Sequence, residues 1–193
     1  MRVFRGRYRR QIALIAAALL LTVSATVLLG RDVAQAGPGA APSAVLGSGI
    51  GGTVQRVQVL SETTAATTSS AVWVNLASMV VVVPAEERAM FLMRFSGESS
   101  CAGGVGAQWC RLRMRIAGAE ANPVVGGDFA FDSTDNGSES FASWESHAIE
   151  RYSRIMGPGT YRVEVQWQVT DPAVRFRLDD WTFVVERVQI ISP

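Results

Sequence analysis

The sequence predicts an all-β protein that folds as a single antiparallel β-sandwich of about eight or nine strands, with a jelly-roll or related Greek-key topology. Two segments, 111–116 and 161–169, alternate apolar and polar residues without a break. This period of two is typical of strands with one buried and one solvent-facing side. Turn-forming residues such as those at 135–137 and 157–159 divide the chain at the short intervals typical of sandwiches. Helical periodicity is not sustained beyond residue 53, so two packed sheets are the simplest architecture that buries the apolar faces of these strands.

Residues 1–36 are predicted to be a signal peptide with a helical apolar segment. Five arginines precede an apolar run over residues 12–30, and Ala34 and Ala36 follow as a small-x-small cleavage site. We expect cleavage after Ala36, which makes the protein secreted or extracytoplasmic. The apolar run also approaches the roughly 20 residues that span a bilayer. An uncleaved N-terminal anchor at the cell surface is therefore the alternative.

A flexible linker is predicted over residues 37–52, which hold six glycines and two prolines without periodicity. Glycines 47, 49 and 52 match the Gly-x-Gly-x-x-Gly of dinucleotide sites, but that motif requires a preceding strand and a following helix. Here a Gly/Pro-rich segment precedes it and a strand-like run follows, so we expect no nucleotide site and no cofactor. The β-sandwich domain is predicted to occupy residues 53–193.

Further strands are predicted in order along this domain. The continuous apolar runs 80–83 and 90–93 are interpreted as strands buried on both sides or at the sandwich centre. The last strand-like region changes phase, because apolar residues stand at even positions in 174–178 and at odd positions in 181–185. This change across Asp179-Asp180 predicts a β-bulge or a tight bend.

The charge of the exported domain argues against nucleic-acid partners. Residues 1–36 hold six of the 18 basic residues and one of the 17 acidic residues, so the remaining chain carries 12 basic and 16 acidic residues and a formal charge of −4. A mildly acidic domain lacks the basic surface that nucleic acids or anionic membranes attract. Every basic residue is arginine, which suggests a GC-rich bacterial genome.

The two cysteines, Cys101 and Cys110, are predicted to form a disulfide, because exported chains keep such bonds. Their spacing is not Cys-x-x-Cys, so a redox pair or a metal site has no support. We expect the bond to close a glycine-rich loop at a sheet edge. Two cysteines one hairpin apart could not form the inter-sheet bridge of an immunoglobulin domain, which is the nearest rival fold.

Six blocks of the sequence carry a resemblance to known proteins: Trp73-Val-Asn-Leu, Arg94-Phe-Ser-Gly-Glu-Ser, Ala130-Phe-Asp-Ser, Ser143-Trp-Glu-Ser-His-Ala-Ile-Glu-Arg151, Gly157-Pro-Gly-Thr-Tyr-Arg-Val-Glu-Val-Gln-Trp167 and Phe176-Arg-Leu-Asp-Asp-Trp-Thr-Phe183. With these blocks the chain resembles a group of small, uncharacterised exported bacterial β-sandwich proteins. The resemblance covers roughly residues 73 to 186 and implies an exported, jelly-roll-like sandwich. The group has no assigned activity, so no functional residues are transferred from it.

An acidic run between residues 128 and 139 is the candidate metal site. Asp132, Asp135, Asn136 and Glu139 offer oxygen ligands of the kind that calcium prefers. Aligned with an EF-hand loop from Asp132, however, the twelfth position is serine and the bidentate glutamate is missing. The alternative is that Asp-Asn-Gly forms a tight hairpin turn with solvated charges.

His147 is the only histidine and therefore the only candidate for a histidine base. Glu145 or Glu150 could orient it in a Ser-His-Asp arrangement. No Gly-x-Ser-x-Gly motif is present, so a half-exposed packing role is the simpler interpretation.

Three arginines on one strand face, Arg111, Arg113 and Arg115, form a candidate anion-binding strip. Cross-strand pairing with acidic residues such as Glu164 is the alternative use of this face.

Five tryptophans offer a further surface. Trp167 and Trp181 alternate with core residues and are expected to point inward. Trp109 lies in the glycine-rich disulfide loop and is the tryptophan we expect to be exposed, which makes it the candidate contact residue.

The predicted function is therefore a non-enzymatic binding module, or a surface or structural protein, outside the cytoplasm. Its partner is an extracellular ligand or a second copy of itself; it binds no nucleic acid and meets the membrane only through an uncleaved N-terminal segment. The alternative is an exported hydrolase, possibly active on carbohydrates, which would need two carboxylates roughly 5–10 Å apart in a cleft.

Overall fold

The computed structural model describes residues 52–127 and 129–191. The predicted signal peptide and the predicted linker as far as residue 51 lie outside the described residues. No helix in the two described ranges is long and apolar enough to cross a membrane.

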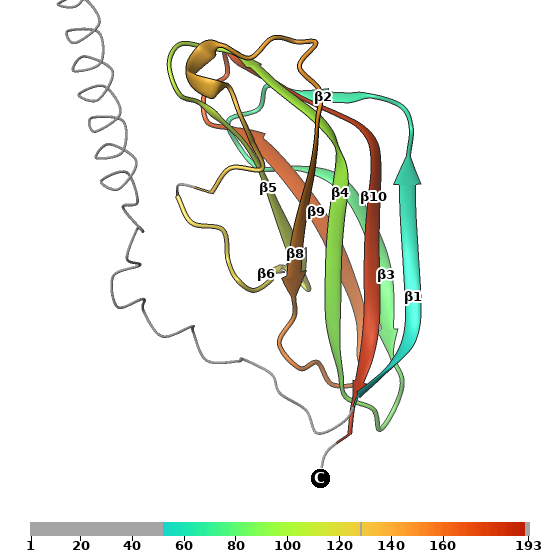
Figure 1. Ribbon diagram of the computed structural model, residues 1–193. Helices are drawn as coiled ribbons and strands as arrows, with labels where there is room; N and C mark the ends of the chain where they lie inside the picture. Colours follow the sequence, from blue (N-terminus) through green and yellow to red (C-terminus); the bar gives the residue numbers. More distant parts are fainter. Residues whose placement is uncertain (1–51, 128, 192–193) are drawn as a thin grey trace, which may run out of the picture. The chain divides into compact units, whose positions relative to one another are not determined.

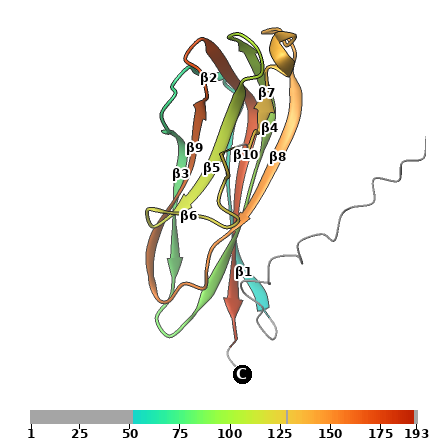
Figure 2. The ribbon, with the colours of Figure 1, turned by 90° about the vertical axis from the view of Figure 1, so that its left-hand side faces the viewer.

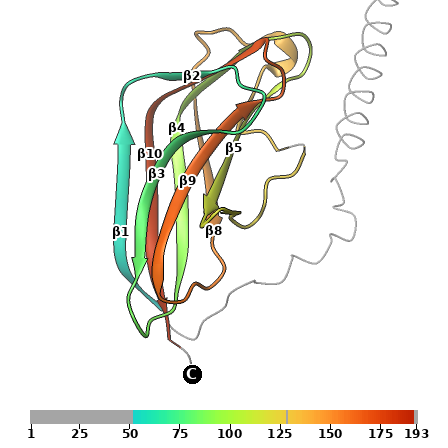
Figure 3. The same ribbon diagram turned by 180° about the vertical axis from the view of Figure 1, so that it is seen from behind.

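Ten strands make up the described domain, which confirms the predicted all-β sandwich. In chain order they are β1 (Gly52–Glu62), β2 (Ala66–Thr68), β3 (Val74–Val83), β4 (Ala89–Gly103), β5 (Trp109–Ile116), β6 (Ala119–Glu120), β7 (Asp132–Ser133), β8 (Glu145–Tyr152), β9 (Gly159–Val169) and β10 (Val174–Ile190). Figure 1 shows the first sheet in front, and Figure 3 shows the second sheet from behind.

The strand order is that of a jelly roll. The first sheet has the order β1-β10-β4-β8, with β2 also paired to β10; the second has the order β3-β9-β5-β6, with β7 also paired to β5. The long strands from β3 to β10 therefore pass alternately between the two layers, which Figure 2 shows from the side. This alternation is the double Greek key of jelly rolls.

The core lies between the layers, where alternate side chains of the strands meet. In β5 the residues Leu112, Met114 and Ile116 are buried while the arginines between them are only half-buried, as the period of two predicts. Trp167 and Trp181 are buried as expected. They pack against core phenylalanines, with ring centroids 5.4 Å and 5.7 Å apart respectively.

The predicted irregularity at Asp179-Asp180 is a β-bulge inside one long strand. The register of β10 against β4 shifts between Asp179 and Thr182, and Asp180 has a φ of 43°. Gly97 lies opposite this bulge, and a Cβ there would lie 2.7 Å from the Cβ of Trp181. The extra residue changes the phase of the side chains, so the apolar residues on both sides of the bulge point into the core.

The prediction that 80–83 and 90–93 are buried on both sides is wrong; of the two runs, only 90–93 lies on an inner strand of its sheet, β4, whereas β3 is an edge strand. Val81 and Val83 are buried, whereas Val80 and Val82 are exposed; Leu92 is exposed in the same way on β4. A two-layer sandwich leaves the outer face of each sheet uncovered, so these runs have one buried face only.

The disulfide is confirmed, but the predicted position at a sheet edge is wrong. Cys101 in β4 belongs to the first sheet and Cys110 in β5 to the second, and both are buried. The segment between them crosses from one layer to the other and is not a hairpin. The bond therefore joins the two sheets, and it is the strand order that excludes an immunoglobulin topology.

Candidate functional site

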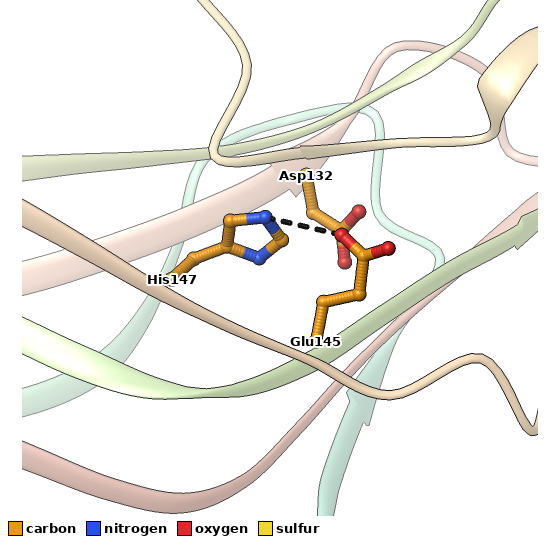
Figure 4. A group of neighbouring side chains, drawn as sticks. All are labelled: Asp132, Glu145 and His147. Atoms are coloured by element: carbon orange, nitrogen blue, oxygen red, sulfur yellow. Dashed lines mark ion pairs between the residues drawn. The ribbon is translucent and has the colours of Figure 1, made fainter.

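Four polar side chains from both sheets converge near the disulfide. We call Ser99 of β4, Asp132 of β7, and Glu145 and His147 of β8 the His147 cluster. One ligand atom each of Asp132, Glu145 and His147 lies within 4.8 Å of the other two, and Figure 4 shows these three side chains pointing toward one another. In the described ranges, no other group of three His, Cys, Asp or Glu side chains is this close.

The strand pairings bring these side chains together. Glu145 and His147 are two residues apart on β8 and emerge on the same face, and Ser99 lies directly opposite Glu145 on β4. Asp132 comes from the other sheet, where it pairs with Cys110. Because Cys110 is bonded to Cys101, two residues after Ser99, the disulfide fixes the distance between the two halves of the cluster.

Ser99 sets the tautomer of His147. The Ser99 hydroxyl, which is fully buried, donates a hydrogen bond to Asp132 Oδ2 at 2.6 Å and lies 2.9 Å from His147 Nδ1. A hydroxyl has one proton, and an ionised carboxylate can only accept it. His147 Nδ1 is therefore the donor to Ser99, which leaves the second ring nitrogen, Nε2, with a free lone pair when the imidazole is neutral.

This lone pair faces a carboxylate. His147 Nε2 lies 3.4 Å from Glu145 Oε2, and the dashed line in Figure 4 marks this contact. Two acceptors at this distance repel each other unless a positive charge lies between them. The charge can be a proton on Nε2 or a metal ion bound to both atoms.

Asp132 adds a second carboxylate, which is more buried than that of Glu145. Burial raises the pKa of Asp132 above its ordinary value, although hydrogen bonds from the Ser99 hydroxyl and the Ser133 backbone N–H oppose the rise. The edge of the Phe131 ring also packs against His147, with 5.5 Å between centroids. The cluster is therefore partly desolvated, and His147 is its one source of compensating positive charge, since the contact with Glu145 is the only ion pair of these carboxylates among the described residues.

The raised pKa of Asp132 gives a testable pH dependence. A carboxyl group with a raised folded-state pKa stabilises the fold fully below the unfolded value of about 3.9, and this contribution is lost as pH rises through the folded value. Asparagine does not ionise, so the Asp132→Asn variant does not lose stability in this way as the pH rises. The difference in unfolding free energy, variant minus native, is therefore expected to increase from pH 4 upward in urea unfolding with a chelator present.

The same substitution at Asp180 is the matched control for this measurement, because the Asp180 side chain is exposed and does not belong to the His147 cluster. A difference between the Asp132→Asn variant and the native protein that stays constant with pH would contradict the proposed burial of an ionised group.

The structure does not gather the four predicted calcium ligands into one group, although the charge of Glu139 lies near enough to add to the rise that burial causes in the pKa of Asp132. Asp132 faces Ser99, whereas Asp135 lies in an exposed 3₁₀ turn, η1 (Asp135–Gly137), and accepts a hydrogen bond from Ser138. Asn136 is exposed in the same turn, and Glu139 forms no three-residue group with these carboxylates in the part of the chain that the structure describes. The turn connects β7 of one sheet to β8 of the other, so the expected hairpin is also absent there.

The arginine row takes part in pairing across its own sheet. Arg115 lies opposite Glu164 of β9 at 3.9 Å. Arg113 binds Gln166 Oε1 and lies over the Trp73 ring at 4.4 Å. These contacts agree with the alternative that we gave for the arginines, which is pairing across strands and not anion binding.

Trp109 does not project from the glycine-rich loop. It is the first residue of β5, opposite Ser133, and it is half-buried, as are Trp73 and Trp144. The exposed apolar residue of that loop is Val105. Trp109 is therefore not distinguished by exposure from the other tryptophans outside the core.

A shallow hollow of about 300 Å³ lies elsewhere, against β4 and β8. Its walls include Leu92, Pro123, Tyr152 and Val184, and no residue of the His147 cluster lines it. The hollow and the cluster are therefore separate features of the domain.

Ser99 is the site residue that sequence reasoning missed. The sequence offered Glu145 or Glu150 as a partner of His147, and the structure places Glu145 there. Ser99 is 48 residues from His147 and carries no motif. No protein-family model matches this chain, and no curated protein matches it significantly. Its function is therefore inferred from the geometry of the His147 cluster.

Proposed function

We propose that this protein is a non-enzymatic β-sandwich module that acts outside the cytoplasm and binds a divalent metal ion of the zinc class at the His147 cluster. The observation that carries the proposal is the convergence of Asp132, Glu145 and His147 within 4.8 Å. The N-terminal leader pattern and the disulfide support a location outside the cytoplasm, where disulfides persist.

The donor set favours zinc over calcium. Calcium takes six to eight oxygen ligands, whereas zinc takes four ligands and accepts imidazole nitrogen together with carboxylate oxygen. Bonds of about 2.0–2.1 Å in a tetrahedron place neighbouring ligand atoms roughly 3.3–3.4 Å apart. The separation of His147 Nε2 from Glu145 Oε2 is 3.4 Å, so these two atoms already have the spacing of zinc ligands.

Ser99 supports the site without touching the metal. By accepting the Nδ1–H of His147 it keeps the lone pair on Nε2, and by donating to Asp132 it holds that carboxylate beside the ring. Such partners raise the basicity of metal ligands and fix their orientation. The cluster supplies three ligands, so a fourth position is left for water or for a group of a partner molecule.

A second candidate function, an exported hydrolase, is favoured by one observation. Asp132 and Glu145 form a close carboxylate pair, and burial raises the pKa of Asp132, as in a general acid beside a second carboxylate. Their oxygen atoms lie within 4.8 Å of each other, which is closer than the roughly 5–10 Å of glycosidases. Against it, the imidazole of His147 lies within 4.8 Å of both groups, and the hollow beside β4 and β8 does not reach them. The binding function therefore fits the geometry better.

Titration of the metal-free protein with zinc tests the proposal. Isothermal calorimetry is expected to show one zinc ion per chain with a dissociation constant in the micromolar range, about −8 kcal/mol. Calcium is expected to give no binding at millimolar concentration, because the site lacks the oxygen ligands. Absence of zinc binding to the folded protein would refute the proposed function. Zinc-dependent hydrolysis of nitrophenyl esters or glycosides that is lost in Asp132→Asn would instead establish the hydrolase.

A further inference from the structure

The edge strand β1 is unusually exposed for an eleven-residue strand. It pairs with β10 along one side, and within the described residues no strand pairs with its other side. Ten of its eleven residues are exposed, including Val54, Val57 and Val59 at 52%, 53% and 59%. Figures 1 and 3 show β1 at the outer margin of the domain. Such an edge offers unpaired N–H and C=O groups to another strand.

We propose that β1 pairs in antiparallel fashion with β1 of a second copy of this chain, across a two-fold axis at Val59. This inference is independent of the metal site. It rests on the order of side chains along β1. When two copies of β1 pair with the axis at Val59, charged residues of one copy lie opposite residues of opposite charge in the other.

The register against β10 assigns each residue of β1 to a face. Gln58 and Leu60 lie opposite the buried residues Val185 and Phe183 and so belong to the inner face. Gln58 accordingly donates a hydrogen bond to the backbone carbonyl of Val80 in the other sheet. Side chains alternate along a strand, so the inner face of β1 carries, in order, Arg56, Gln58, Leu60 and Glu62.

The charged residues of the inner face would form ion pairs between the two copies. A two-fold axis at Val59 places Arg56 opposite Glu62 of the second copy, and the symmetry repeats this pair on the other side of the axis. Opposite charges in directly facing positions stabilise a strand pair, and like charges destabilise it. An axis at Gln58 or at Leu60 would leave both charges opposite uncharged residues.

The Glu62 carboxylate is held in place at the end of β1. Its Oε1 accepts hydrogen bonds from the backbone N–H groups of Thr63 and Thr64 at 2.9 and 3.0 Å. The hydrogen bond from Thr64, together with that from Thr63, lowers the pKa of Glu62, so the group stays charged, and neither bond uses Oε2.

The outer face of the same strand is apolar. Val59 would meet its own copy at the axis, and Val57 would lie opposite Ser61 of the second copy. On β10 the neighbour of Val59 is Val184, which continues the apolar strip into each subunit. Pairing would remove these exposed valines from water and join the first sheets of two copies into one continuous sheet.

A charge swap tests this register. Sedimentation equilibrium of the protein purified after full-length expression is expected to show a monomer–dimer equilibrium at micromolar concentrations. Arg56→Glu and Glu62→Arg, each alone, place like charges opposite each other and are expected to weaken the dimer at least about 10-fold. The combined variant restores opposite charges and is expected to recover the native dissociation constant to within roughly 3-fold.

Val105→Lys is the matched control, because Val105 is an exposed valine in the loop between β4 and β5; it is expected to leave the equilibrium unchanged. Thermal unfolding of each variant separates loss of association from loss of folding, since Glu62→Arg also removes the bonds to Thr63 and Thr64. A native protein that stays monomeric at about 200 µM would overturn the proposal. A dimer that survives Arg56→Glu, or one that the combined variant fails to restore, would place the interface on another surface and would overturn it equally.

Discussion

Replacing His147 with alanine is expected to lower the affinity for zinc at least about 100-fold, or roughly 2.7 kcal/mol. His147 is the only histidine in the sequence and supplies the only nitrogen ligand of the cluster. Its removal leaves two carboxylates, a set that suits zinc less well than imidazole with carboxylate. Calorimetry of the variant with zinc measures the loss directly.

A folding measurement gives a second readout of the same change. Zinc at about 100 times its dissociation constant is expected to stabilise the native protein by about 2.7 kcal/mol. The His147→Ala variant is expected to lose this zinc-dependent stabilisation while it remains folded, because His147 is only partly buried.

Two further variants distinguish residues that bind zinc from Ser99, which only orients those residues. Ser99→Ala is expected to weaken zinc binding by roughly 10-fold, because it frees Nδ1 of His147 without removing a ligand. Glu150→Gln is the matched control: Glu150 lies on the same strand but pairs with Arg94 on the outer face at 2.7 Å. If zinc binds His147→Ala as tightly as the native protein, the proposed ligand set is wrong.

Replacing both cysteines with alanine is expected to lower the free energy of unfolding by about 2–3 kcal/mol. The disulfide closes a short loop in the unfolded chain and so reduces the entropy gained on unfolding. The loss is not confined to one edge of the fold, because the bond joins β4 to β5 and thus one sheet to the other. Urea unfolding of the Cys101→Ala, Cys110→Ala variant measures the change.

Reductant provides the control for the disulfide. Reducing the native protein is expected to lower its stability toward that of the double variant, whose own stability does not respond to reductant. The double variant is also expected to bind zinc more weakly, since Ser99 and Asp132 are held near each other by this bond. Unchanged stability in the variant would show that the inter-sheet bond is not a significant constraint.

The strands that the sequence predicted most firmly were the ones with a strict period of two. The segment 161–169 coincides with most of β9, and 111–116 with most of β5. The phase change at Asp179-Asp180 also identified the bulge in β10. Alternation is a local property that depends on backbone geometry alone, so it can be read without knowledge of the partners of a strand.

Burial of continuous apolar runs was predicted less well. The run 80–83 contains four valines, yet every second one is exposed on β3. Hydrophobicity sets the preference of a side chain for burial, but whether a second layer covers a sheet face depends on the number of layers in the fold. The expected exposure of Trp109 failed for a similar reason, because its place at the start of β5 is fixed by pairing.

The sequence by itself determined the all-β class, the bulge, the pairing of the two cysteines and the closeness of Glu145 to His147, because each depends on residue type and short spacing. Only the tertiary structure decided that the disulfide joins the sheets, that Ser99 and Asp132 complete the His147 cluster, and that β1 is an exposed edge. These features follow from strand order, which for example places Ser99 beside Asp132, 33 positions later in the sequence. Strand order reflects the packing of the whole sandwich, and no local pattern encodes it.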